Sequence, residues 1–329
     1  MKSADLSPNR RSIQIVPLES NDLPAAAELF THNYRRLRQA VPALPLGFAQ
    51  PAGLIERLQS MVAAGRLLAA VQAGRLLGYL SWYLVDGFRA AARRAAYCPV
   101  WGHAVVEGQE AAVYSALYAE AARLWLQAGR NTHALTFLAG DRAQQNLWFW
   151  NGFGLAVVDA VRDMQPLGVE CPSELVVRIA EAADAEALAA LDREHCQHYT
   201  QPPVLMAARL IEDAAALASF IAQPGCSIWL AEWAGQPAGF LRFAAGELDM
   251  ADIVQGQDTV GITGAYTRPE FRGCGIAPAL LDAALSHYSA LGFGRCAVDF
   301  ESFNPQAAGF WPRYFTPVCY SVIRVPEAP

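Results

Sequence analysis

The sequence has little charge and no long run of one sign. Only 17% of its 329 residues are charged, and the formal net charge is −6. Because nucleic-acid binding requires clustered Lys and Arg, we expect no nucleic acid among the partners. A hydrophobic fraction of 53% supplies sizeable cores and excludes a disordered or coiled-coil chain. The small acidic excess mildly favours a neutral or cationic small substrate.

Long apolar runs and paired cysteines are also missing. The first 20 residues lack the apolar core of a signal peptide, and no uncharged apolar run reaches the ~18 residues of a membrane helix. No two cysteines form a Cys-x-x-Cys pair, and no spaced ligand set for a metal is found. We therefore expect a cytoplasmic protein without a membrane or metal partner, whose cysteines are reduced. The cysteines are Cys98, Cys171, Cys196, Cys226, Cys274, Cys296 and Cys319.

An internal repeat divides the chain. Three landmarks of its first part recur about 162 residues later: a hairpin glycine, a glycine that ends a long helix, and an aspartate that opens a helix. These pairs are Gly74 and Gly235, Gly129 and Gly292, and Asp22 and Asp184. Pro166, Gly168 and Pro172 interrupt regular structure between the copies. The sequence predicts two domains, residues 1–166 and 174–329.

Each copy is predicted to run strand, helix, helical stretch, hairpin, strand, long helix, strand, helix and closing strand. In the first copy these elements are residues 13–17, 23–38, 54–64, 67–83, 101–106, 113–128, 134–138, 144–150 and 155–164. In the second they are residues 175–180, 185–199, 204–222, 227–243, 260–267, 276–291, 297–301, 306–313 and 318–325. The run from Arg89 to Arg94 could clamp a phosphate, although a solvated loop is the simpler interpretation.

Residues 264–281 read as a strand, a glycine turn and an amphipathic helix. Gly273 and Gly275 permit a tight turn and a close approach to the backbone amides. The following helix offers unpaired N–H groups and its positive dipole end, which together suit phosphate oxygens. Ile276-Ala277 cannot serve as the Lys-Ser/Thr of a Walker loop, and Pro278 replaces the third glycine of a dinucleotide fingerprint.

The six residues from Arg272 to Ala277 fit another pattern. Arg272, Gly275 and Ala277 occupy the fixed positions of the pyrophosphate loop Gln/Arg-x-x-Gly-x-Gly/Ala, and residues 267–273 match the usual approach to it. The sequence thereby resembles the GNAT N-acetyltransferases across nearly the whole chain. The resemblance implies an α/β fold of α+β type with two tandem GNAT-like domains. Each domain would have a mixed, mostly antiparallel central sheet flanked by helices.

The resemblance also implies acetyl-CoA as the cofactor, bound by the second domain. Pantetheine would lie between two splayed strands, and the diphosphate would lie on the loop. The residues that the resemblance assigns to cofactor binding are Ala265, Tyr266, Thr267, Arg272, Gly273, Cys274, Gly275, Ile276, Ala277 and Asn304. Asn304 alternatively reads as a helix N-cap, and both roles can hold at once.

The first copy lacks the glycines of this loop. Gln109 aligns with Arg272, but Ala112 and Tyr114 stand at the two small-residue positions, and Glu110 adds negative charge. We therefore predict a degenerate first domain that binds no cofactor and has a structural or acceptor-pocket role.

The catalytic residues are less clearly marked. Many relatives place a Tyr as general acid where this chain has Trp311, and an indole is no useful acid. Tyr314 could take that role or pack between the domains. Asp299 and Glu301 share one strand face, so Glu301 is a candidate base or substrate-orienting carboxylate. Glu232 is a weaker candidate. His195 and His198 read as helix-terminal cations near the substrate mouth.

The sequence thus predicts an N-acetyltransferase. It would move an acetyl group from acetyl-CoA to a primary amine of a small molecule or peptide in a direct ternary complex. The alternative is a catalytically silent acyl-CoA-binding module. A transferase that uses charged tRNA is a third option, but it needs a basic channel that the composition does not show. A homodimer is possible.

Overall fold

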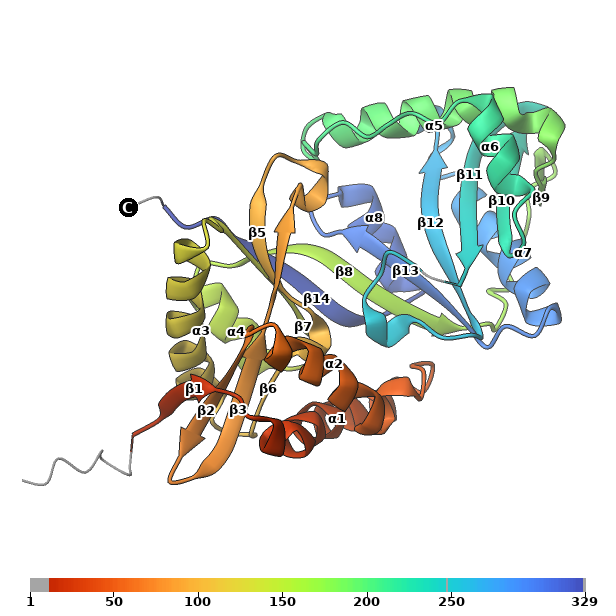
Figure 1. Cartoon of the computed structure of the whole chain (residues 1–329). Coiled ribbons are helices and arrows are strands. Elements are labelled where there is room, and N and C mark those ends of the chain that lie inside the picture. The colour runs from red at the N-terminus through yellow and green to blue at the C-terminus, as the bar shows by residue number, and fades with distance from the viewer. Residues whose placement is uncertain (1–11, 247, 328–329) are drawn as a thin grey trace, which may run out of the picture.

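The chain folds into two lobes that share one large β-sheet (Figure 1). This computed structural model describes residues 12–246 and 248–327. We call the elements from β1 to β8 the first half and those from β9 to β14 the second half. In Figure 1 the first half lies at the lower left and the second half at the upper right. The start of the predicted first domain, with the segment that was tested for a signal peptide, lies partly outside the described residues.

The first half follows the predicted order and adds a hairpin, β4 and β5, that the sequence did not predict. Its elements are β1 (Gln14–Pro17), η1 (Ser20–Asp22), α1 (Leu23–Ala40), η2 (Gly47–Ala49), α2 (Ala52–Ala63), β2 (Leu67–Gln72), β3 (Arg75–Ser81), β4 (Tyr83–Asp86), η3 (Phe88–Ala90), β5 (Arg94–Cys98), η4 (Val100–Gly102), β6 (His103–Val105), α3 (Glu110–Gln127), β7 (Thr132–Leu138), α4 (Arg142–Trp150) and β8 (Gly154–Asp163).

The second half repeats this order without an extra hairpin. Its elements are β9 (Leu175–Ile179), η5 (Ala182–Asp184), α5 (Ala185–Thr200), α6 (Ala214–Ile221), β10 (Cys226–Trp233), β11 (Gln236–Ala245), η6 (Asp252–Val254), β12 (Thr259–Thr267), η7 (Pro269–Phe271), α7 (Ile276–Ala290), β13 (Arg295–Glu301), α8 (Pro305–Phe310), η8 (Trp311–Arg313) and β14 (Thr316–Arg324).

Helix α1 shows how the sequence pattern produces these elements. Leu23, Ala26, Phe30 and Tyr34 recur every three or four residues, so they share one helix face, and all four are buried. Pro24 stands in the first turn, where the missing N–H leaves no helix bond unmade. The apolar face of α1 packs onto the sheet, while the opposite face is solvated.

The described strands form a sheet of four and a sheet of ten. The first has the order β1-β2-β3-β6, and the second has the order β4-β5-β7-β14-β8-β13-β12-β11-β10-β9. Among the described pairs, only β5 with β7 and β12 with β13 are parallel. The predicted α+β fold with mixed, mostly antiparallel sheets flanked by helices is confirmed.

The closing strand of each half lies among strands of the other half. β14 pairs with β7 on one side and β8 on the other, and β8 pairs in turn with β13. In Figure 1, β8 and β14 run side by side through the middle of the molecule. The ten-stranded sheet is therefore built from strands of both halves. The boundary between residues 1–166 and 174–329 stays a prediction about the sequence repeat, because it does not divide the sheet.

The exchange is symmetric about the central pair of strands. Thr136 of β7 lies opposite Ser321 of β14, and Asp299 of β13 lies opposite Asp159 of β8. Each residue of one pair is related to a residue of the other by the spacing of the sequence repeat. The two halves are thus joined in matching registers, and equivalent positions can be compared residue by residue.

The core is also shared. Val161 of β8, Ala297 of β13 and Val318 of β14 pack with Tyr34 of α1 in one buried cluster. Removing one half would expose apolar surface of the other, so we treat the chain as one folding unit.

One predicted helix is much shorter than expected. Residues 204–222 were predicted to be helical, but only Ala214–Ile221 forms α6. Asp213 caps this helix, since its Oδ1 accepts a hydrogen bond from the amide of Ala216 at 2.8 Å. The cap sets the start of the helix and leaves residues 204–213 as a connecting segment beside the site.

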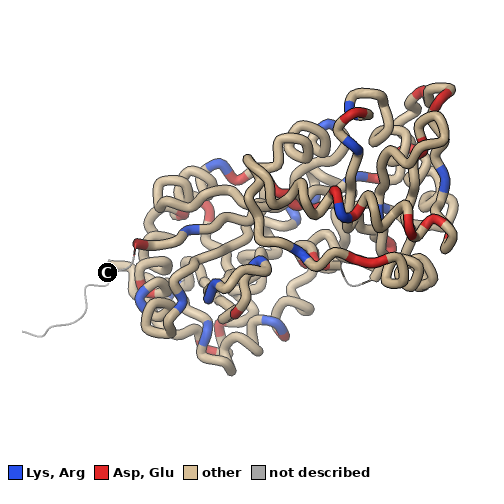
Figure 2. The backbone as a smooth tube through the Cα atoms, turned by 90° about the horizontal axis from the view of Figure 1, so that it is seen from above, with Lys and Arg blue, Asp and Glu red and all other residues tan. Residues whose placement is uncertain are grey.

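Acidic and basic residues are scattered along both halves in Figure 2, as the low charge content predicts. No described helix is long and apolar enough to cross a membrane.

Candidate active site

The sheet of the second half opens between β12 and β13. These parallel strands pair only through residues 259–262 of β12. A β-bulge at Thr263 follows, and β12 continues to Thr267 with β11 as its remaining partner. The free edge of residues 264–267 faces the cavity described below. An extended ligand with amide groups can lie there as an added strand.

The turn after β12 presents free backbone amides. Gly273 and Gly275 have φ of +84° and +80°, and a Cβ on either residue would meet no atom within 4 Å. No acceptor within the described residues is found for the amides of Gly273, Gly275, Ile276 and Ala277. These amides lie at the start of α7, where the helix dipole also favours negative charge. The turn can therefore hold a phosphate or diphosphate.

Arg272 lies at the mouth of this turn. Its Nε donates to the carbonyl of Thr267 at 3.1 Å, while the side chain stays exposed. This bond fixes the guanidinium beside the end of β12, where it can meet an anion. Cys274 lies between the two glycines and is half-buried, but it does not line the cavity.

One cavity of about 690 Å³ connects the strand gap with the glycine turn. It brings together all the predicted site residues except Cys274. The predicted residues that line it are Ala265, Tyr266, Thr267, Arg272, Gly273, Gly275, Ile276, Ala277, Glu301, Asn304 and Tyr314. Lining residues that the prediction did not assign to the site include Tyr199, Met206, Arg209 and Asp299.

Helix α8 closes one side of the cavity. Asn304 is its N-cap, with Oδ1 3.5 Å from the amide of Ala307, and it also lines the cavity, as both sequence interpretations allow. Trp311 is buried to 5% exposure and packs into the core. Tyr314 is half-buried, with its ring 5.0 Å from that of Phe310. Tyr314 is thus the tyrosine that this side of the cavity contributes.

Glu301 is held by a residue from the first half. Arg89 places Nη2 3.4 Å from Oε1 of Glu301 and 3.9 Å from the sulfur of Met206. Arg89 sits in the turn between β4 and β5, which the sequence analysis treated as a solvated loop or a phosphate clamp. The structure corrects that interpretation, because Arg89 reaches across to the site of the second half. Burial, followed by the charge of Glu301, raises the pKa of Tyr199 beside it.

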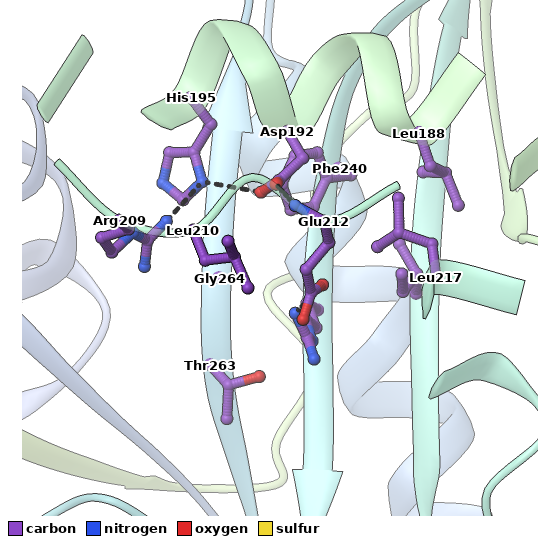
Figure 3. Close-up of a pocket in the computed structure, with 12 residues that line it drawn as sticks. Leu188, Asp192, His195, Arg209, Leu210, Glu212, Leu217, Phe240, Thr263 and Gly264 are labelled. Atoms are coloured by element: carbon purple, nitrogen blue, oxygen red, sulfur yellow. Dashed lines mark hydrogen bonds and ion pairs between the residues drawn. The ribbon is translucent and has the colours of Figure 1, made fainter. Parts of the chain in front are cut away.

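A smaller cavity of about 120 Å³ lies between α5 and strands β11 and β12 (Figure 3). In it His195 stands between Asp192 and Arg209, with Nδ1 3.7 Å from the Asp192 carboxylate and 3.3 Å from Nη2 of Arg209. Burial lowers the pKa of His195 despite the neighbouring Asp192. The prediction of a helix-terminal cation is therefore wrong for His195, which is buried and neutral. His195 lines both cavities and connects them.

Glu232 does not belong to the site. Its Oε1 accepts from Nη2 of Arg178 at 3.0 Å, and it does not line the cavity. Glu232, a weaker candidate base because it lies in the hairpin, thus forms a structural ion pair with Arg178.

The first half has an equivalent but smaller cavity, of about 410 Å³. Tyr114 lines it and is buried to 1% exposure, with its hydroxyl bonded to His103 and Gln144. The turn before α3 has one glycine with positive φ, Gly108, and no counterpart of Gly275.

A splayed pair of strands next to a glycine-rich helix start suits an extended ligand that carries a diphosphate. Residues 189–315 match the sequence model of the acetyltransferase (GNAT) family. The predicted resemblance to the GNAT family is therefore confirmed for this part of the chain, and it supports acetyl transfer in general. No curated protein matches the chain.

Several solved structures are similar to the chain. A GCN5-related N-acetyltransferase from Sphaerobacter thermophilus is 14% identical, with 98% of each chain covered and a TM-score of 0.55. The glucosamine N-acetyltransferase region of a fungal multi-domain β-N-acetylglucosaminidase is 12% identical, with 97% of this chain and 38% of that chain covered and a TM-score of 0.51. A tandem GNAT protein from the clavulanic acid biosynthesis pathway is 16% identical, with 97% and 100% coverage and a TM-score of 0.46. At these identities the first two show a common fold.

Proposed function

We propose that the protein transfers an acetyl group from acetyl-CoA to a primary amine of a small molecule or peptide in a direct ternary complex. The observation that supports this is the single cavity that joins the free amides of residues 273–277 to the open edge of β12. A diphosphate suits the amides, and the amides of pantetheine suit the strand edge. Both are parts of coenzyme A.

The chain's own groups suit the parts of acetyl-CoA. The backbone of Ala265, Tyr266 and Thr267 binds pantetheine, and the side chain of Asn304 contacts the same arm. A backbone amide near Thr267 stabilises the oxyanion that forms when the amine attacks the thioester. Tyr314 donates a proton to the sulfur that leaves. Direct transfer needs no acyl-enzyme, so Cys274 has no covalent role.

Glu301 suits the role of a substrate-orienting carboxylate better than that of a mobile base. Its protonation would cost the contact with Arg89, and both side chains are largely shielded, with 14% and 22% exposure. A fixed carboxylate on the acceptor side can hold the ammonium or a neighbouring donor of the substrate in line with the thioester.

Two measurements test this function together. Isothermal titration with acetyl-CoA reports binding, and a thiol-release assay over a panel of primary amines reports transfer. We expect a one-to-one complex and release of CoA that depends on one class of amine. Mass spectrometry of a product heavier by one acetyl group would confirm the reaction type.

The alternative is an acyl-CoA-binding module without catalysis. The observation that favours it is Trp311, which is buried where many relatives place their acid. Binding of acetyl-CoA without CoA release over the whole amine panel would support the module and contradict the transferase.

A further inference from the structure

Two carboxyl groups, one from each half, are cross-strand partners at the border of the large cavity. Asp299 of β13 and Asp159 of β8 are direct partners in an antiparallel ladder. Such partners project from the same face with Cβ atoms roughly 5 Å apart. Asp159 is 3% exposed, and its Oδ1 accepts from the amide of Ala251 at 2.8 Å. Asp299 is half-buried and lines the cavity.

No cation compensates these carboxyl groups. Among the described residues neither Asp159 nor Asp299 forms an ion pair with an arginine or a histidine. The titratable and charged groups that face the pair are Asp249 before η6, Glu301 of β13 with its partner Arg89, Tyr199 of α5, Cys319 of β14 and Tyr97 of β5.

Burial and mutual repulsion keep a proton on this pair. Burial raises the pKa of Asp159 to about 6 against the effect of the Ala251 amide. Burial, and then the charge of Asp159, raises the pKa of Asp299 well above its usual value. Two uncompensated carboxylates this close do not both ionise, so they titrate as a unit. Near neutral pH the pair holds one proton and one negative charge.

The other half shows that the fold does not require acids here. The equivalent ladder pair is Thr136 and Ser321, whose hydroxyl oxygens lie 2.6 Å apart. Thr136 also bonds the hydroxyl of Tyr97 at 3.0 Å. The same backbone position is therefore satisfied by a neutral hydroxyl pair. The carboxyl pair occurs only at the copy of this position that borders the open cavity.

We propose that Asp299 and Asp159 form the proton acceptor for the amine, with Asp299 in contact with the substrate and Asp159 acting through it as a positioning residue. This inference rests on the proposed acetyltransferase function. It makes the first half part of the reaction centre, because β8 supplies Asp159.

The proton transfer balances as follows. The N–H bond of the ammonium breaks and an O–H bond forms on Asp299, whose own proton passes to Asp159 directly or through one water. The pair becomes neutral, and the freed lone pair of the amine attacks the thioester carbon. When the C–S bond breaks, sulfur takes the electron pair. Tyr314 protonates that sulfur and regains its own proton from the nitrogen, and the pair releases its added proton to solvent.

The pH profile of kcat/KM tests the role of Asp159. Below about pH 6 the wild-type pair carries two protons and accepts none, so activity should fall there. In Asp159→Ser the acid limb depends on Asp299 alone, whose pKa burial still raises well above its usual value, so the limb should move to higher pH. The loss of the second carboxyl, to which Asp299 passes its proton, should also reduce kcat/KM at high pH by about 10-fold. An unmoved acid limb would overturn the inference.

Two further variants test whether the effect is specific to this carboxyl pair. The double change Asp159→Ser with Asp299→Thr installs the pair that the other half already accommodates, so it should fold and bind acetyl-CoA while losing about 100-fold in kcat/KM. Ser321→Ala alters the equivalent position of the other ladder and should leave the acid limb unchanged. A double variant that keeps wild-type kcat/KM would contradict the proposal.

An infrared difference spectrum separates this inference from the proposed function. At pH 7 the wild type should show one protonated carboxyl band that the double variant lacks. If the wild type acetylates an amine but shows no such band, the protonated carboxyl pair is contradicted, while the proposed acetyltransferase function is supported. The band together with acetyl-CoA binding but no CoA release would refute the transferase and, with it, the proton-acceptor role.

Discussion

The two halves place different groups at the same gap in the sheet. In the second half the gap between β12 and β13 opens into the large cavity. In the first half His103 spans the equivalent gap, since its Nε2 donates to the carbonyl of Thr136 in β7 at 2.9 Å. Burial lowers the pKa of His103 to about 4, so the ring is neutral and its Nδ1 accepts from the Tyr114 hydroxyl. A side chain here occupies the position that pantetheine would take.

The helix starts differ in the same way. In the first half Glu110 folds back so that its Oε1 accepts from the amide of Gly108 at 2.9 Å. In the second half no carboxylate among the described residues accepts a hydrogen bond from the amides after Gly273. The comparison indicates that, in this fold, the gap between the two strands and the free amides at the helix start are places to be occupied. One half supplies its own side chains, while the other leaves both places to a ligand.

The strongest test of this comparison removes the Tyr114 side chain that lines the first-half cavity. Tyr114→Ala should reduce the free energy of unfolding by about 3–5 kcal/mol, because it deletes a fully buried ring and two hydrogen bonds. The reciprocal change Ala277→Tyr should leave stability within about 1 kcal/mol and remove acetyl-CoA binding. Urea denaturation and titration calorimetry measure the two effects. If Tyr114→Ala cost less than about 1 kcal/mol, the first-half cavity would not depend on its filling.

A carboxylate placed at the open helix start should copy the first half. Gly275→Glu is expected to weaken acetyl-CoA binding at least 100-fold, because the new charge repels the diphosphate and covers the amides. Gly292→Glu is the matched control: this residue ends α7 with φ of +88°, so it carries a similar backbone strain away from the cavity. Equal affinity of the two variants would remove the phosphate assignment.

The local features of the site could be predicted from the sequence, whereas the long-range strand pairing could not. The glycine turn, α7 and the shared face of Asp299 and Glu301 were predicted, since they depend on residues close in sequence. The exchange of β8 and β14 was not predicted. Alternation along a strand identifies its buried face but does not identify its neighbours in the sheet.

The cross-half contacts were missed for the same reason. Arg89 lies in a short run of alanines and arginines that is typical of a solvated loop, and nothing near it in sequence points to Glu301. Asp159 looks like an ordinary polar residue in a closing strand. Both acquire a role only when the exchanged strands bring the halves together.

The carboxyl pair should also affect stability. The folded-state pKa of Asp159 lies near 6, above its unfolded value, so the native state binds a proton that the unfolded state has released. Stability therefore falls as pH rises from about 4 to about 6, by on the order of 2 kcal/mol. Asp159→Ser removes the contribution of Asp159 and leaves that of Asp299, so the variant should lose less stability over this range and be more stable than the wild type at pH 7. Denaturation at pH 4, 5, 6 and 7 measures the difference, and parallel curves for the two proteins would contradict it.

The smallest effect tests whether the first half shapes acceptor binding. Arg89→Ala should raise KM for the amine about 10-fold, because Glu301 loses the partner that orients it, and should leave acetyl-CoA affinity unchanged. Arg89 has φ of +55°, and alanine meets the same backbone strain, so the change isolates the guanidinium. Arg93→Ala is the control, since this exposed side chain of the same hairpin contacts no described group of the site. An unchanged KM for the amine would leave Arg89 as a structural contact and confine acceptor recognition to the second half. Partial recovery of that KM in Arg89→Lys would show that the positive charge acts on the acceptor through Glu301.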